Sequence, residues 1–424
     1  MTNPYLEYGI SDAVWRMGEE AYEEARPAVQ RIERIREFNQ LRVLRAFRNA
    51  RISDSHFTQQ TGYGYDDIGR EKIEAMYAEV FGAESALVRI QISAGTQAIA
   101  MCLYGILRPG DELLSVTGTP YDSLLSAIGG PEYPSDAGSL YDFGVRYRAV
   151  SLLEDGSPDI PAITSAVTDK TKMIYIQKSQ GYSGRRALLR QDLVAIFRAV
   201  REKNPSTVLF VDNCYGEFTE EEEPCALGAD LCAGSLIKNP GAGICPSGGY
   251  IAGRRDLVEK AASRGTAPGL AGHVGPSLGF SRTIAQGLFL APHITAECLK
   301  GAVFAAALFS RAGYVTAPDP LAVRGDIVQS LTFTSPEQVV SFCQMIQASS
   351  PVDSFVSPEP WDMPGYDSEV VMAAGTFIQG ASVELSADGP IKPPFIAYMQ
   401  GGLVYEQVKL ATMQAVEKMG VARL

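Results

Sequence analysis

Short apolar runs alternate with amphipathic stretches through the middle of this chain. The apolar runs occupy residues 87–92, 113–116, 145–152, 173–177, 208–211 and 231–237. Between them, residues 95–107 and 189–203 carry apolar side chains at helical spacing. Strands that alternate with helices are typical of βαβ units, so the pattern predicts a mostly parallel sheet.

The two ends of the chain carry different patterns. Residues 13–50 place apolar side chains at helical spacing among many charges, which predicts one long amphipathic helix or two. Beyond residue 313 the chain shows isolated strands, including one at 382–385, and two helices. We expect an α/β protein of three parts: an N-terminal helical arm at 1–58, a large domain with the mostly parallel sheet at 59–300, and a smaller α+β domain at 301–424.

The composition is that of a globular protein, because 46% of the 424 residues are hydrophobic. The chain has 37 Lys and Arg against 49 Asp and Glu, a formal net charge of −12, and no basic block offsets it. This balance argues against a nucleic-acid partner. No segment reaches the roughly 20 apolar residues of a membrane span, and the N-terminus lacks a signal-peptide pattern. We expect a cytoplasmic protein without a membrane partner.

Cysteine and histidine usage argues against a metal site. Seven cysteines are scattered without a C-x-x-C pair, which fits neither a disulfide framework nor a zinc cluster. Only three histidines occur, and none lies at metal-ligand spacing from another. We expect reduced cysteines and no bound metal.

An aspartate and a lysine follow two predicted strands. Asp212 comes directly after an apolar run and emerges where open α/β sheets bind ligands. Lys238 follows the next run, where burial disfavours a charged amine. Pyridoxal phosphate needs such a lysine for its aldehyde and an acidic group for its ring nitrogen. A helix-capping aspartate and an ordinary surface lysine explain this pair equally well.

A segment of small residues at 93–97 lies between a predicted strand and a predicted helix. Its free backbone N–H groups and the dipole of the helix that follows could bind a phosphate. It matches neither the dinucleotide glycine motif nor a Walker A loop. Tyr121, at a later strand end, could stack on a flat cofactor ring. Each feature alone also fits an ordinary α/β fold, as a common turn and as a tyrosine on the sheet edge.

A glycine-rich loop at residues 61–70 interrupts the helical pattern with Tyr63, Tyr65 and Arg70. Its permissive backbone and the Arg70 guanidinium could reach a phosphate. A plain loop followed by a helix cap explains the segment equally well.

Six segments in a fixed order give the chain a family resemblance. They are residues 61–70, 93–97, 119–122, 211–218, 235–241 and 375–377. With them the chain resembles the methionine gamma-lyase-like family of fold-type I pyridoxal-phosphate enzymes, which includes aluminium resistance and cystathionine beta-lyase-like proteins. The resemblance covers nearly the whole chain, and the lysine and aspartate motifs are highly specific in combination.

The resemblance implies a role for each candidate residue. Lys238 would bond covalently to pyridoxal 5'-phosphate, Asp212 would face its ring nitrogen, and Tyr121 would stack on its ring. The implied phosphate ligands are Gly95, Thr96 and Ser235.

The resemblance also implies an assembly. Tyr63, Tyr65 and Arg70 would cross a dimer interface to complete the partner's site, and the homo-oligomer would be a dimer of dimers. The apolar stripe of the N-terminal arm favours such an assembly, since the arm cannot bury the stripe alone. An arm that folds back over its own domain is the alternative.

Three positions depart from the family pattern. Gln97 stands where the family usually has histidine, and Ala242 where it usually has glycine. Lys392 stands in place of an arginine, and it could hold a substrate carboxylate only as a point charge rather than as a fork. The identity of the substrate therefore stays open.

The predicted function is a lyase that expels a thiol from a sulfur-containing amino acid, with Lys238, Tyr121 and Asp212 as catalytic residues. Elimination at the β or γ carbon, γ-replacement and racemisation could use the same residues. An alternative from another class is a metal-tolerance protein without turnover, which the four glutamates at 220–223 suggest. Consecutive carboxylates are more often a solvated surface.

Overall fold

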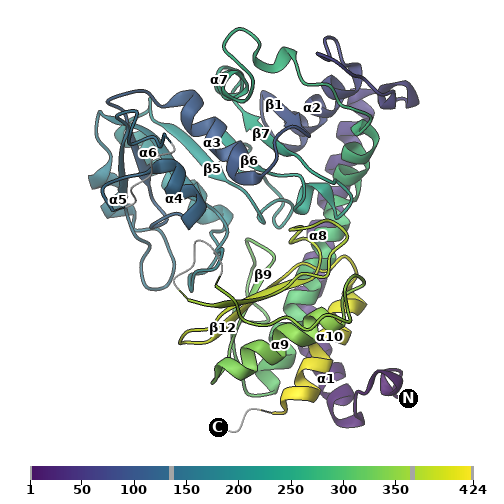
Figure 1. Ribbon diagram of the computed structural model, residues 1–424. Helices are drawn as coiled ribbons and strands as arrows, with labels where there is room; N and C mark the ends of the chain where they lie inside the picture. Colours follow the sequence, from purple (N-terminus) through teal and green to yellow (C-terminus); the bar gives the residue numbers. More distant parts are fainter. Residues whose placement is uncertain (1, 133–137, 363–367, 422–424) are drawn as a thin grey trace.

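The computed structural model describes residues 2–132, 138–362 and 368–421. The N-terminal arm is one helix, α1 (Asp12–Ala50), and the Ser11 side chain accepts a hydrogen bond from the Val14 N–H at its start. Helix α1 packs along α8 (Ser281–Arg311), and the two run side by side from the large domain to the small one (Figure 1).

A seven-stranded sheet forms the centre of the large domain, in the order β1, β7, β6, β5, β4, β2, β3. Its strands are β1 (Ser85–Arg89), β2 (Glu112–Ser115), β3 (Arg146–Ala149), β4 (Thr171–Gln177), β5 (Val208–Asp212), β6 (Leu231–Ser235) and β7 (Gly249–Gly253). Strands β2 to β6 pair in parallel, whereas β7 runs antiparallel to both neighbours. The predicted mostly parallel sheet is confirmed.

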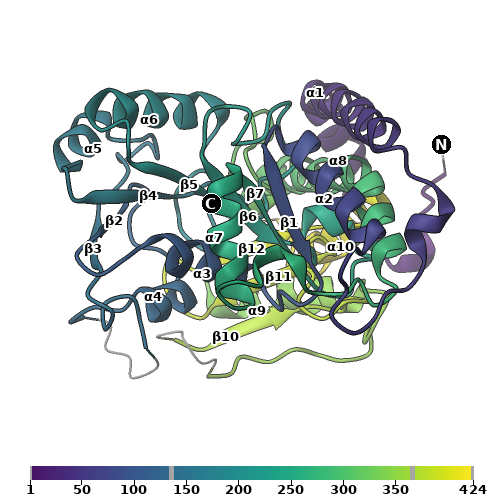
Figure 2. The ribbon, with the colours of Figure 1, turned by 90° about the horizontal axis from the view of Figure 1, so that it is seen from above.

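Helices cover both faces of this sheet, as Figure 2 shows for α5 and α6 on one side and α3 and α4 on the other. One face packs on α3 (Gly95–Ile106), α4 (Asp122–Ile128) and α7 (Arg255–Gly265). The other packs on α2 (Ile68–Phe81), α5 (Ile160–Ala166), α6 (Arg190–Lys203) and parts of α1 and α8. Alternate strand residues face opposite cores, as the two-residue period of a strand requires.

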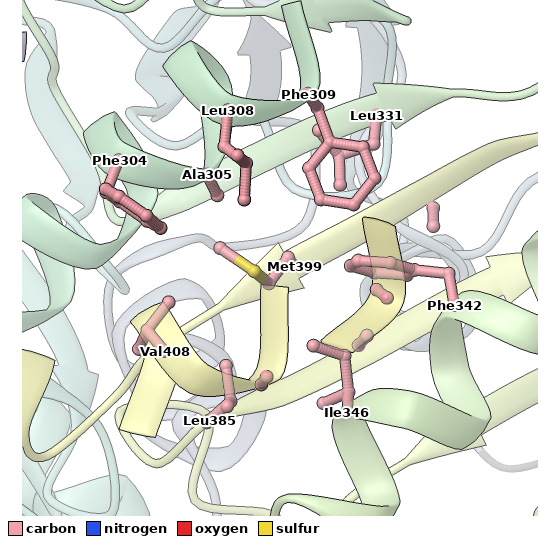
Figure 3. Close-up of a cluster of buried hydrophobic side chains, with 14 of the residues drawn as sticks. Phe304, Ala305, Leu308, Phe309, Leu331, Phe342, Ile346, Leu385, Met399 and Val408 are labelled. Carbon is pink, nitrogen blue, oxygen red and sulfur yellow. The ribbon is translucent and has the colours of Figure 1, made fainter. Parts of the chain in front are cut away.

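The C-terminal part is built on an antiparallel sheet of five strands in the order β10, β11, β12, β9, β8. Their bounds are β8 (Val315–Ala317), β9 (Val328–Thr332), β10 (Val370–Ala373), β11 (Ser386–Pro390) and β12 (Ile396–Gln400). Helices α9 (Pro336–Ala348) and α10 (Tyr405–Met419) join α1 and α8 around the apolar core shown in Figure 3.

The strand predicted at 382–385 is wrong. Those residues form a turn, and β11 begins only at Ser386. The Glu384 carboxylate accepts hydrogen bonds from the N–H groups of Phe377 (2.8 Å) and Ile378 (2.9 Å). A carboxylate that caps a neighbouring loop in this way takes its segment out of the regular strand geometry.

Helix α8 is long and apolar enough to cross a membrane by length and composition alone. However, 72% of its apolar window is buried inside the protein, where it packs in the core with α1. The core helix of a globular protein passes the same test, so this is weak evidence for a membrane span. The helix also continues across residue 300, so it belongs to both the large and the small part.

Candidate active site

Strand β5 ends in the buried carboxylate of Asp212, which is 3% exposed at the carboxyl edge of the large sheet. The Tyr175 hydroxyl in β4 donates to Asp212 Oδ2 (3.0 Å), and the Cys214 backbone N–H donates to Oδ1 (3.1 Å). Both carboxylate oxygens therefore have a fixed partner.

Burial raises the pKa of the Asp212 carboxyl above its ordinary value, because it disfavours the charged form. The charge of Lys238 and the hydrogen bonds from Cys214 and Tyr175 lower this pKa without cancelling the effect of burial. Both donors to Asp212 are neutral, and no described residue forms an ion pair with it. A cationic N–H group placed beside Asp212 would therefore gain a charge-assisted hydrogen bond.

Lys238 lies in the turn after β6. Its Nζ is 4.0 Å from the centroid of the Tyr215 ring, within cation–π range. Tyr215 adopts a left-handed φ of 69°, in the loop that follows Asp212. The turn closes at Gly241, where a Cβ would come within 1.6 Å of the Leu236 carbonyl oxygen, so only glycine fits there.

The protonation of Lys238 follows from its neighbours. Burial lowers its pKa, but the acidic groups around it outweigh burial, so the pKa stands above its ordinary value. These groups are, in order of effect, Cys214, Tyr215, Asp212 and Tyr121. In the free protein Lys238 is thus an ammonium at neutral pH, and it must lose a proton before its amine can react.

Helix α3 begins at Gly95 with no side-chain cap, so the first N–H groups of the helix are left for a ligand. A Cβ on Gly95 would lie 3.1 Å from Cys214 Sγ and 3.4 Å from the Cβ of Ser235, which is buried at the end of β6. The helix end therefore touches both strand ends that carry the candidate residues. A helix dipole and uncapped N–H groups at this position favour a negatively charged ligand.

Tyr121 precedes α4 and belongs to the same site. Burial raises the pKa of its hydroxyl well above the ordinary value, Asp212 and Cys214 raise it further, and a side-chain hydrogen bond with Thr96 acts the other way. The structure thus brings together six of the predicted site residues: Lys238, Asp212, Tyr121, Gly95, Thr96 and Ser235.

The other three predicted residues lie elsewhere in the single chain. The Tyr63 and Tyr65 rings are exposed and stack with centroids 5.4 Å apart. Arg70 is buried and donates to the carbonyls of Gly64 (2.8 Å) and Gly275 (2.9 Å). The contacts described for this loop are with residues 275–277 rather than with Lys238 or Asp212.

The three positions that depart from the family pattern lie in different local environments. Gln97 Oε1 accepts from the Ser93 N–H and hydroxyl, both at 2.7 Å. Ala242 adopts a left-handed φ of 52°, which favours glycine. Lys392 is exposed in the turn between β11 and β12.

Comparison with known proteins identifies the family. The methionine gamma-lyase family model matches residues 14–420. The chain belongs to the methionine gamma-lyase family. It is 51% identical over 392 residues to the uncharacterized protein YnbB of Bacillus subtilis (strain 168), and the aligned region covers 92% of each of the two chains. It is also similar to a crystal structure of a carbon–sulfur lyase involved in aluminium resistance from Clostridium novyi NT, with TM-score 0.95, 46% identity and 98% of each chain covered.

A more distant structure shows how widely the fold extends. The pyridoxal-5'-phosphate-dependent protein YhfS of Escherichia coli aligns with TM-score 0.60 and 16% identity, covering 91% of this chain and 97% of its own. At this identity the likeness concerns the fold alone. The resemblance and the fold class predicted from the sequence are both confirmed for this member of the family.

The sequence pattern did not identify the two tyrosines that contact the central pair. Tyr175 lies inside a predicted strand, and only the parallel pairing of β4 with β5 brings it to Asp212. Tyr215 lies inside the aspartate motif, and its left-handed backbone brings its ring to Lys238. A tyrosine near the end of a buried strand is a usable signal only once the order of the strands is known.

Proposed function

We propose that this member of the methionine gamma-lyase family is a pyridoxal-phosphate-dependent lyase that cleaves a carbon–sulfur bond in a sulfur-containing amino acid. The proposal rests on one observation: an amine, a buried carboxylate and an uncapped helix end meet at one edge of the sheet. These are the three groups that this cofactor needs. The family and its Clostridium novyi relative support the same reaction class.

The site residues fit the cofactor. Lys238 would bond to the aldehyde of the cofactor. Asp212 would pair with the cationic ring N–H of the cofactor, and this pair would offset the cost of burying the carboxylate charge. Glycine at position 95 keeps the anion site open. Gly95, Thr96 and Ser235 would bind the phosphate, and Tyr121 would stack on the ring. When bound, the cofactor supplies a ring that accepts an electron pair from the substrate.

The protein's own groups then move protons. Once the amine of the substrate has displaced Lys238 from the aldehyde, the free Nζ would take the proton from the α-carbon, and for a γ-elimination it would take a second proton from the β-carbon. Asp212 would hold a proton on the ring nitrogen of the bound cofactor. The Tyr121 hydroxyl, close to Thr96 and Asp212, assists the departure of the sulfur leaving group.

The acidic run at 220–223 gives little support to the metal-tolerance alternative. Glu220 pairs with Lys178 (3.4 Å), Glu222 with Arg190 (2.7 Å), and Glu223 with Arg42 (3.3 Å). Among the residues that the structure describes, no group of three or more His, Cys, Asp or Glu could hold a metal ion. These carboxylates serve as ion-pair partners within the fold.

The test combines labelling with a substrate screen. Borohydride treatment of the yellow holoprotein should fix the cofactor on the peptide that contains Lys238, and Lys238→Ala should abolish the label. Sulfur-containing amino acids should release a keto acid and a thiol, whereas racemisation or γ-replacement would give other products. Asp212→Asn should retain the label but lose most turnover, since an amide cannot hold the ring proton. Labelling of another lysine would overturn the site assignment.

A further inference from the structure

The loop between β4 and α6, residues 178–189, connects the site to the small domain. The Lys178 N–H donates to the Asp212 carbonyl (3.1 Å). Further along, the Tyr182 ring packs edge-on against Tyr398 of β12, with centroids 5.5 Å apart, and its hydroxyl accepts from Gln400 (3.2 Å). The same loop carries a cation, Arg185, close to Asp212.

The guanidinium of Arg185 lies at the carboxyl edge of the large sheet. Nη1 donates to the Arg186 carbonyl (3.0 Å), and Nη2 donates to the carbonyls of Gln177 (2.8 Å) and Ser179. Gln177 is the register partner of Asp212 on the adjacent strand. Three of the five N–H donors of the guanidinium are thus used, and the other two have no hydrogen-bond partner among the described residues.

Among the residues that the structure describes, no carboxylate forms an ion pair with Arg185, whose donors go to backbone carbonyls. Burial lowers its pKa to about 10, although the nearby carboxylates of Asp326 and Asp212 act to raise it. Both oxygens of Asp326 already accept from other groups: the Ser179 hydroxyl and the N–H groups of Gln180 and Val328. By contrast, the adjacent Arg186 binds Asp192 with both Nη atoms (2.6 and 2.9 Å).

The other cations around the site are less suited to an anionic ligand. Lys178 Nζ donates to the Gly216 carbonyl (3.1 Å) and pairs with Glu220 (3.4 Å). Lys238 is required as the reacting amine. Lys392 is exposed in the turn between β11 and β12. A partly desolvated guanidinium with free donors gains most from a carboxylate, through charge-assisted hydrogen bonds.

We propose that Arg185 binds the α-carboxylate of the amino acid substrate. This inference rests on the proposed function, because the amino group of the substrate must come to Lys238 for the carboxylate to lie at this edge of the sheet. It assigns the specificity for amino acids over amines and amides to the loop after β4 rather than to Lys392.

The test uses two ligands that differ only at the carboxylate, L-alanine and L-alaninamide. Neither carries a leaving group, so each can be titrated against the holoenzyme by the change in cofactor absorbance. We expect Arg185→Gln to weaken L-alanine binding about tenfold to a hundredfold and to leave L-alaninamide within about twofold, as the loss of one charged hydrogen-bond partner predicts. Arg186→Gln, which loses the Asp192 pair instead, should leave the ratio of the two dissociation constants unchanged.

Several outcomes would overturn the assignment. If Arg185→Gln weakens the binding of both ligands equally, Arg185 only holds its loop in place. If the wild-type protein binds L-alanine no better than L-alaninamide, no group in the site recognises the carboxylate and the assignment has no basis. A fall in the ratio in Lys392→Gln but not in Arg185→Gln would move the role to Lys392. If Arg185→Gln does not fold, Arg185→Lys replaces it, since this variant keeps the charge but loses the planar donors. An unchanged ratio of the two dissociation constants in Arg185→Lys would likewise overturn the assignment.

The titration separates this inference from the proposed function. If the ratio responds to Arg185→Gln but no sulfur-containing amino acid releases a thiol, the lyase proposal fails and the assignment of Arg185 stands. If thiol is released and the ratio does not respond, the assignment fails and the lyase proposal stands.

Discussion

At the scale of single residues, the site is surrounded by acidic groups that burial keeps protonated more readily than exposed ones. Burial raises the pKa of Asp212, and it raises the pKa of Glu217 to about 8. The Tyr250 hydroxyl donates to Glu217 Oε1 (2.9 Å), while Oε2 has no partner in the described residues. Such groups make both activity and stability sensitive to single substitutions.

Replacing Tyr175 with phenylalanine keeps the ring and removes the hydroxyl that donates to Asp212 Oδ2. We expect turnover to fall about tenfold, because a hydrogen bond to a charged group contributes about 1.5 kcal/mol. Steady-state kinetics with the best sulfur-containing substrate checks this. The matched control is Tyr104→Phe on α3, which removes a hydroxyl that donates to the Ala127 carbonyl of α4 (2.7 Å) and should keep wild-type turnover.

Glu217→Gln should flatten the dependence of stability on pH. The folded pKa of about 8 exceeds the ordinary 4.5, so the folded state binds more protons between these values and stability falls as pH rises through them. Removing the titration should shrink the change in the free energy of unfolding between pH 5 and pH 8 by on the order of 2–4 kcal/mol. Urea denaturation across this range measures it.

The control for that experiment is Glu222→Gln, in the acidic run and partly exposed beside Arg190. It should leave the pH dependence of unfolding unchanged. If the stability of Glu217→Gln depends on pH as steeply as that of the wild type, Glu217 is not the buried protonated carboxyl that titrates in this range.

At the scale of elements, α1 is tied directly to the loop that follows β5 and carries Tyr215. Asn39 is fully buried, and its Nδ2 donates to the carbonyls of Phe218 (3.2 Å) and Glu220 (3.0 Å). Arg42, one turn later, donates to the Glu221 carbonyl (2.8 Å). The arm therefore supports the backbone on which the site is built.

Asn39→Ala should loosen this connection. Two buried carbonyls lose their donor, so we expect a loss of about 1–3 kcal/mol in the free energy of unfolding, together with weaker cofactor retention. Thermal unfolding and the absorbance of the dialysed holoprotein measure the two effects. The control is Gln40→Ala, also on α1, which removes an exposed hydrogen bond to the Phe289 carbonyl of α8. It should change neither the stability nor the cofactor retention. Equal effects of both substitutions would count against the connection.

On the surface of the single chain, two groups of large apolar or aromatic side chains are exposed. Tyr63 and Tyr65 are exposed in a loop that does not contact Lys238 in its own chain. Along α1, Phe38, Leu41 and Leu44 are 46%, 61% and 39% exposed, an apolar stripe that a second copy would cover. Both features support the prediction of a homo-oligomer with shared sites.

Mixing Lys238→Ala chains with Arg70→Ala chains tests this prediction. If each site takes Lys238 from one chain and Arg70 from the other, mixed dimers have one intact site, and random exchange restores up to about a quarter of wild-type activity. Activity of the remixed chains, compared with each mutant alone, is the measurement. Complete subunit exchange without any recovery would exclude the shared site.

The class of the fold, the family, and the central lysine and aspartate were all predictable from the order of the residues. Apolar periodicity is a property of contiguous residues, so it located the strands that became β1 to β6. Motifs are equally local, and they singled out Lys238 and Asp212. The division at 1–58, 59–300 and 301–424, the roles of the site residues and the assembly stay predictions.

Only the tertiary structure decided which side chains meet. The order of the strands sets Tyr175 beside Asp212, the left-handed backbone of Tyr215 brings its ring to Lys238, and the return of the loop after β4 sets Arg185 at the Gln177 carbonyl. The segment at 61–70 was recognised from the sequence, yet its residues Tyr63, Tyr65 and Arg70 lie apart from Lys238 within one chain. Contacts between strands and loops depend on pairing over long sequence separations, which no local pattern of residues encodes.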